Sequence, residues 1–126
     1  MNRKPMHSIF SLIVLVTQLS TGQEDYQKWV LQWNTPRSVI MLLREKKLEK
    51  RYSVSYHLNP FYLRGDFDGD GNTDVAILVE EKETAKKGIA ICHFSRNEIF
   101  FVGAGTPIGN GGDDFRWMDI WSVYPK

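Results

Sequence analysis

The sequence predicts an α+β fold, with an N-terminal helix (or two) packed on an antiparallel β-meander. Three observations support this prediction. Apolar residues near the start of the chain recur at helical spacing, later apolar segments are short and strand-like, and turn residues separate those segments. Short strands joined by tight turns pair with their neighbours in sequence, and the helices then cover one face of the sheet.

Residues 1–22 are expected to be a secretory signal peptide rather than part of this domain. A basic start is followed by an apolar run from Ile9 to about Leu19, and then by small residues up to Gly22. This order is typical of signal peptides, and the run is shorter than the roughly 20 residues that a membrane-spanning helix needs. An uncleaved anchor is the alternative. The mature protein, residues 23–126, would then be a single domain that is secreted or periplasmic.

The charge balance and the cysteine count of residues 23–126 limit the classes of function. Loss of Arg3 and Lys4 leaves 14 basic residues against 15 acidic ones. A near-neutral domain gives no reason to expect a nucleic acid or an anionic membrane as its partner. The single cysteine, Cys92, cannot form an internal disulfide. Because small secreted domains often need such a cross-link, a bound metal ion is an attractive substitute.

Two helices are expected before the sheet. The first is predicted by an apolar stripe at helical spacing, formed by Tyr26, Trp29, Val30 and Trp33. The second is expected over residues 36–49, because Thr35 can cap a helix that has Pro36 at its first position. A strand over residues 38–43 is the alternative interpretation of that segment.

The remainder of the chain is expected to form strands joined by turns. Turns are expected at residues 86–88 and 95–98, and a glycine-rich loop at residues 103–112. The expected strands cover residues 51–58, 61–65, 74–80, 89–94, 99–105 and 115–123.

The stretch "DFDGDGNTD" at residues 66–74 is the strongest functional signal. If its first residue is position 1, oxygen-bearing side chains occupy positions 1, 3, 5, 7 and 9, namely Asp66, Asp68, Asp70, Asn72 and Asp74. Calcium is a hard cation that takes six to eight oxygen ligands, and a glycine at position 6, here Gly71, permits the sharp turn of such a loop. An EF-hand would need a glutamate at position 12, where this chain has Ile77. The pattern therefore predicts a calcium loop that runs directly into a strand.

These residues carry a resemblance to a known family. The segment "GDFDGDGNTDVAIL", residues 65–78, resembles the calcium-binding loop of FG-GAP and VCBS-type repeats, as in integrin α-chain propellers. The resemblance implies that the aspartates bind calcium through their side chains and Asn72 through its backbone carbonyl. A propeller needs at least four blades, whereas this chain has one copy of the motif. The resemblance therefore implies a small secreted domain with a single calcium loop.

The leading functional prediction is a non-catalytic calcium-binding domain that acts by binding a protein partner, such as an inhibitor or immunity-type protein. The sequence contains no zinc motif, catalytic triad or phosphate loop. Cys92 and His93 resemble a nucleophile and its base, but neighbouring side chains on a strand point to opposite faces.

Two other classes of function remain open. The first is a small calcium-dependent hydrolase, with a carboxylate such as Glu80, Asp113 or Asp114 near the ion. Asp113 and Asp114 could alternatively form a second ion site or an ordinary solvated turn. The second class is a carbohydrate-binding module, which would expose Trp117 and Trp121 as a flat aromatic surface. Burial of these two tryptophans in the core is the alternative.

Overall fold

A computed structural model describes residues 22–26 and 28–124 and divides into two units, residues 1–34 and 35–126. In the first unit, residues 22–26 and 28–34 are helical, as predicted. The rings of Tyr26 and Trp29 stack with centroids 6.3 Å apart. The predicted signal peptide lies outside the described residues, apart from Gly22.

The second unit begins with helix α2, Arg37–Glu45, and a short 3-10 helix, η1, Leu48–Lys50. The predicted helix over residues 36–49 is thus confirmed in its first part, and the alternative strand is wrong. The α-helix ends early because Lys47 adopts a left-handed conformation, with φ 56°, which stops the α-helical hydrogen-bond pattern. The buried side of α2 consists of Val39, Leu42 and Leu43.

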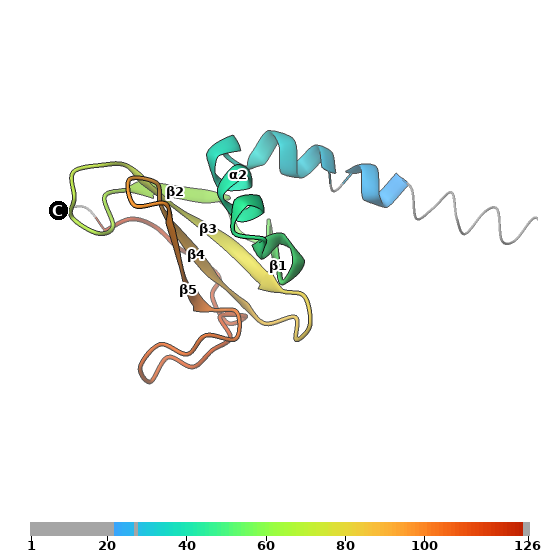
Figure 1. Cartoon of the computed structure of the whole chain (residues 1–126). Helices are drawn as coiled ribbons and strands as arrows, with labels where there is room; N and C mark the ends of the chain where they lie inside the picture. The colour runs from blue at the N-terminus through green and yellow to red at the C-terminus, as the bar shows by residue number, and fades with distance from the viewer. Residues whose placement is uncertain (1–21, 27, 125–126) are drawn as a thin grey trace, which may run out of the picture. The chain divides into compact units, whose positions relative to one another are not determined.

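Five antiparallel strands follow and confirm the α+β class (Figure 1). They are β1 (Tyr52–Val54), β2 (Tyr62–Gly65), β3 (Asp74–Glu81), β4 (Lys87–His93) and β5 (Glu98–Gly103). The order along the sheet is β1, β3, β4, β5, and β2 also pairs with β3. No helix within residues 22–26 and 28–124 is long and apolar enough to cross a bilayer.

Strands β1 and β2 lie end to end along the same edge of β3, which is a departure from a simple meander. Val54 pairs with Val79, and Tyr62 pairs with Ile77. The predicted strand over residues 51–58 is therefore too long, because the chain leaves the sheet after β1 and returns at β2. Pro60 lies in this excursion and has no backbone N–H to donate to a sheet.

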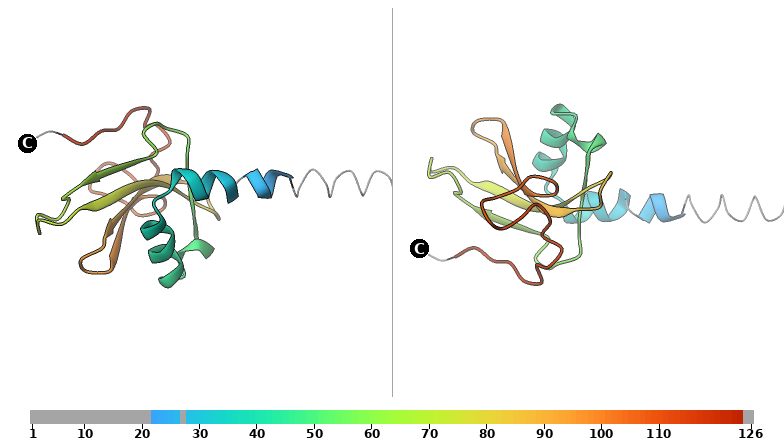
Figure 2. Two further views of the ribbon diagram at one scale, coloured as in Figure 1. Left: turned by 90° about the horizontal axis from the view of Figure 1, so that it is seen from above. Right: turned by 90° about the horizontal axis from the view of Figure 1, so that it is seen from below.

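Both faces of the sheet are covered. On one face, α2 packs over Val75, Ile77 and Val79 of β3. On the other face, Ala76 and Leu78 of β3 pack against residues of the C-terminal segment. Figure 2 shows this segment, in red, and α2, in green, on opposite sides of the sheet. A strand buried on both faces explains why β3 is a continuous apolar run rather than an alternating one.

The predicted C-terminal strand, residues 115–123, is wrong. This segment has no regular strand structure, although it buries Phe115 and Trp121. Trp121 donates its indole N–H to the carbonyl oxygen of Pro60 at 2.7 Å. The alternation of apolar and polar residues over 115–123 therefore arises because this segment packs on one face of the sheet. Its backbone does not form a strand of the sheet.

The turn before β4 is at residues 82–86, not at the predicted 86–88. Gly88 lies inside β4, where a Cβ atom would be 2.4 Å from the backbone nitrogen of Ala104. The glycine is thus required by the close approach of the loop after β5, and not by a turn.

Candidate metal centre

The aspartate loop connects β2 to β3. The strands that flank it pair through Gly65 and Asp74, so the loop closes on itself. Gly69 and Gly71 have φ angles of 78° and 85°, in the left-handed region that side chains disfavour. These glycines let the chain curl tightly enough to turn successive carboxylates toward one another.

Asp66, Asp68 and Asp70 form an acidic cluster at the surface. Each offers a carboxylate oxygen, and these oxygens all lie within 4.8 Å of one another. Asp66 also accepts hydrogen bonds from the backbone N–H groups of Gly69, at 2.7 Å, and Gly71, at 3.1 Å. The loop backbone thereby holds the carboxylates together, and such a cluster could bind a metal ion.

Asp70 is held in its charged form. The hydroxyl of Ser95 donates to Asp70 Oδ2, and the backbone N–H of Asn72 donates to Oδ1 at 2.7 Å. These two donors, with Ser95 the larger contributor, lower the pKa of Asp70 to about 2. Ser95 lies in the turn between β4 and β5, so this contact also joins that turn to the aspartate loop.

A second group of ligand atoms lies deeper, where Asp68 and Asp74 meet His93 at the end of β4. His93 Nδ1 is 3.2 Å from Asp68 Oδ2 and 3.0 Å from Asp74 Oδ2. Three buried atoms of this group make no hydrogen bond: Asp74 Oδ1, Asp68 Oδ2 and His93 Nδ1. Asp74 Oδ2 accepts the backbone N–H of Phe67 at 2.9 Å. Asp68 therefore belongs to both groups.

His93 was not predicted as a site residue, because the sequence suggested it only as a base for Cys92. The pairing of β3 with β4 places Cys92 opposite Val75 and brings the next residue, His93, beside Asp74. A correct position for the turn before β4 would have given this register. Cys92 itself faces the core, where burial and the charge of Asp74 raise the pKa of its thiol to about 12.

Arg96 supplies a positive charge at the edge of the deeper group. Its guanidinium is 2.7 Å from Asp68 Oδ2 and 3.5 Å from Glu98. The side chain of Arg96 is 51% exposed, so a cation that binds Asp68 can displace it into solvent.

The candidate hydrolase carboxylates lie away from the aspartate loop. Glu80 lies near the other end of β3, where it is opposite Lys87 in the strand register. Asp113 forms an ion pair with Lys86, and Asp114 accepts the backbone N–H of Lys87 at 3.0 Å. Asp113 and Asp114 therefore anchor the glycine-rich loop to the start of β4.

The two C-terminal tryptophans do not form one surface. Trp117 is 68% exposed, whereas Trp121 is buried against the sheet. The flat pair of exposed rings that a carbohydrate-binding module would need is therefore not formed by these residues.

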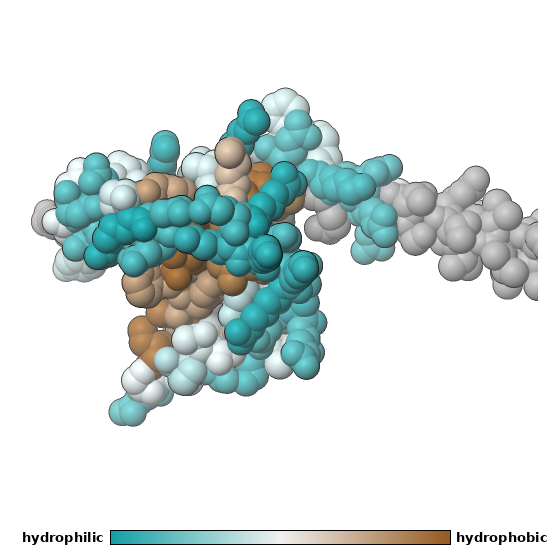
Figure 3. Space-filling model, in the orientation of Figure 1, coloured by the Kyte–Doolittle hydropathy of each residue, from teal (hydrophilic) through white to brown (hydrophobic). Residues whose placement is uncertain are grey.

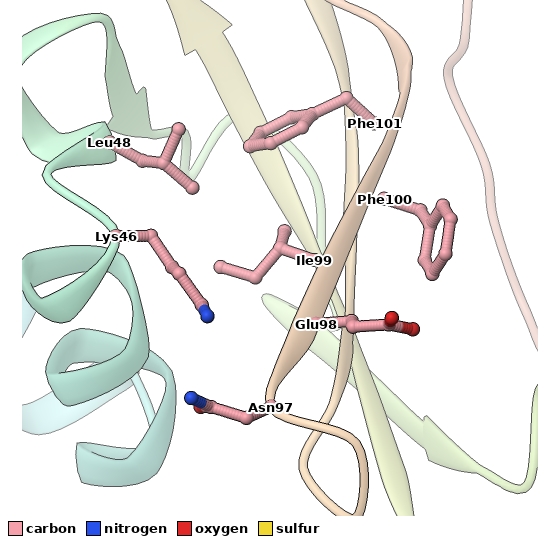
Figure 4. A pocket seen from close by; sticks show the side chains of 7 residues that line it. All are labelled: Lys46, Leu48, Asn97, Glu98, Ile99, Phe100 and Phe101. Carbon is pink, nitrogen blue, oxygen red and sulfur yellow. The ribbon is translucent and has the colours of Figure 1, made fainter.

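An open groove runs between the end of α2 and β5 (Figure 4). Apolar surface gathers along β5 on the face in Figure 3. Phe100 is half exposed, and Figure 4 shows its ring on the side of β5 away from Lys46 and Leu48. The residues that line the groove are Lys46, Leu48, Asn97, Glu98, Ile99, Phe100 and Phe101. Because β5 is the last strand of the sheet, the described chain leaves one of its edges unpaired.

No protein family, curated protein or solved structure matches the chain at a significant level.

Proposed function

We propose that the chain is a secreted or periplasmic, non-catalytic domain that binds calcium through a loop of the FG-GAP and VCBS type and acts by binding a protein partner. The observation that carries the proposal is the convergence of the Asp66, Asp68 and Asp70 carboxylates within 4.8 Å. The full predicted ligand set adds Asn72 and Asp74.

The chemistry of the loop favours calcium as the ion. Four carboxylates within nine residues repel one another, and a dication reverses the sign of that interaction. Asp74 Oδ1 is buried and has no hydrogen-bond partner, and a bound cation would supply one. Magnesium fits less well, because it demands a compact octahedron and is reluctant to lose its waters.

A role in binding rather than catalysis agrees with the position of the other carboxylates. Calcium-dependent hydrolysis would need a second acid or base beside the ion. Glu80 lies near the opposite end of β3, across from Lys87 in the strand register. Asp113 binds Lys86, and Asp114 accepts the backbone N–H of Lys87 at the same end of the sheet.

The groove along β5 is a suitable surface for the protein partner. It runs along an unpaired strand edge, and the half-exposed ring of Phe100 lies on the side of β5 away from α2 (Figure 4). The groove begins at Asn97, and the preceding turn contacts the aspartate loop through Ser95 and Arg96. Calcium would therefore fix the turn from which the groove starts, and partner binding is expected to depend on calcium.

A pull-down from an envelope extract tests this function. The purified protein should retain a specific protein in calcium and release it in chelator, and Asp70→Asn should retain none. Phe100→Ser should lose the same partner while keeping calcium binding. Equal capture by the wild-type protein and Asp70→Asn, with and without chelator, would refute the calcium-dependent partner.

Export is a separate part of the proposal. The exported protein is expected to begin at Gln23, because small residues end the predicted signal at Gly22. Intact-mass measurement of the protein recovered from the periplasm or the medium checks this. A mass that retains residues 1–22 would refute cleavage at this site.

A further inference from the structure

Three buried polar atoms beside the aspartate loop have no hydrogen bond, although Asp68 Oδ2 lies 2.7 Å from the guanidinium of Arg96. The three atoms are Asp68 Oδ2, Asp74 Oδ1 and His93 Nδ1, and their side chains are only 9%, 0% and 7% exposed. Buried polar groups are nearly always paired, because an unpaired one loses its hydration without compensation. A single ligand that contacts all three side chains would account for their arrangement.

The spacing of these side chains fits a small metal ion. His93 Nδ1 is 3.0 Å from Asp74 Oδ2 and 3.2 Å from Asp68 Oδ2, yet neither contact has hydrogen-bond geometry. Nitrogen and oxygen ligands bound at about 2.0–2.1 Å to one tetrahedral zinc ion are separated by roughly 3.3 Å. The observed separations are close to this value. Calcium binds its oxygen ligands at about 2.3–2.6 Å, but it takes six to eight of them, so neighbouring ligands lie at similar separations and the distances alone do not choose the metal.

The imidazole decides the class of metal. Calcium and magnesium prefer oxygen ligands, whereas imidazole suits zinc and its neighbours in the first transition row. We propose that Asp68, Asp74 and His93 bind a transition-metal dication of the zinc class. The predicted calcium set contains no nitrogen ligand, so His93 distinguishes the two ions. Because Asp68 and Asp74 belong to both ligand sets, zinc and calcium would compete for these two carboxylates.

Arg96 is the expected competitor of this metal. Its guanidinium is 2.7 Å from Asp68 Oδ2, one of the three atoms without a hydrogen bond, and its side chain is half exposed. A dication that takes this oxygen repels the arginine, which can move into solvent. Removal of the arginine charge should therefore strengthen metal binding.

Calorimetric titration of the purified protein with zinc chloride tests the proposal. The wild-type protein should bind one zinc ion, and His93→Gln should weaken binding by more than the roughly 10–100-fold that loss of an outer-shell partner costs. His57→Gln is the matched control, because His57 is exposed and bonds to Ser55 instead, and it should bind as wild type. Arg96→Gln should bind zinc more tightly than wild type.

Two further measurements separate the outcomes. In NMR spectra of the wild-type protein, zinc should shift the imidazole proton resonances of His93 and leave those of His57 unchanged. This measurement needs no variant, so it does not depend on whether His93→Gln folds. Asp70→Asn should lose the calcium response and keep zinc binding, so the zinc site can fail or survive independently of the calcium loop. If zinc leaves the His93 resonances unchanged, or if His93→Gln binds zinc as wild type does, the group is a buried ion pair only.

Discussion

Replacement of Trp121 with alanine is expected to lower the free energy of unfolding by about 3–5 kcal/mol. Trp121 is 9% exposed, packs on Ala76 and Leu78, and donates its indole N–H to Pro60. The variant would lose both the apolar contact and the hydrogen bond that hold the C-terminal segment on the sheet. This cost is a large share of the roughly 5–15 kcal/mol that stabilises a typical domain. Urea unfolding followed by far-UV circular dichroism measures it.

Trp117→Ala is the matched control. Trp117 lies in the same segment but is 68% exposed, so its loss should change stability by only about 0.5 kcal/mol. If the two variants unfold at the same urea concentration, the C-terminal segment does not cover the sheet as described.

The fold class was predictable because it depends on local patterns. The helical stripe of α2 and the apolar run of β3 each have the period and length of the element that they form. The predicted C-terminal strand was wrong. Phe115 and Trp121 are buried in the core, but the segment that carries them has no regular strand structure. Periodicity reports which side chains are buried, and it does not report whether the backbone pairs.

Gly88, which was predicted to lie in a turn at residues 86–88, was misinterpreted for a similar reason. A glycine in sequence signals either a turn or a close approach of two backbones, and only the tertiary structure separates these cases. Gly88 belongs to the second case, because the backbone of Ala104 occupies the space of its Cβ. The resulting shift of the turn concealed the register that brings His93 to Asp74.

The candidate metal centre was predictable in its local part only. Asp66, Asp68 and Asp70 lie in one loop, so their spacing alone predicts that they converge. His93, Ser95 and Arg96 come from a distant segment, and their contacts with the loop depend on the pairing of β3 with β4. The calcium ligand set as a whole remains a prediction.

Calcium is expected to raise the melting temperature of the protein, and Asp70→Asn is expected to abolish that increase. An ion that binds only the folded state adds RT ln(1 + [L]/Kd), or about 2.7 kcal/mol at a hundredfold excess over Kd. Extracellular sites can have Kd values of about 10⁻⁴–10⁻³ M, so the measurement needs millimolar calcium. Magnesium at the same concentration should have a smaller effect. Differential scanning calorimetry in calcium, magnesium and chelator measures these differences.

The sign of the Asp70→Asn effect should reverse between the two conditions. The amide oxygen can still accept the backbone N–H of Asn72, the hydroxyl of Ser95 can turn to accept from the amide N–H, and one of the mutually repelling charges is removed. In chelator the variant should therefore melt at the same or a slightly higher temperature than wild type, and in calcium at a clearly lower one. Asp119→Asn is the control, because Asp119 is exposed and lies outside the loop. If Asp70→Asn and Asp119→Asn respond to calcium alike, the loop is an acidic turn without a metal ion.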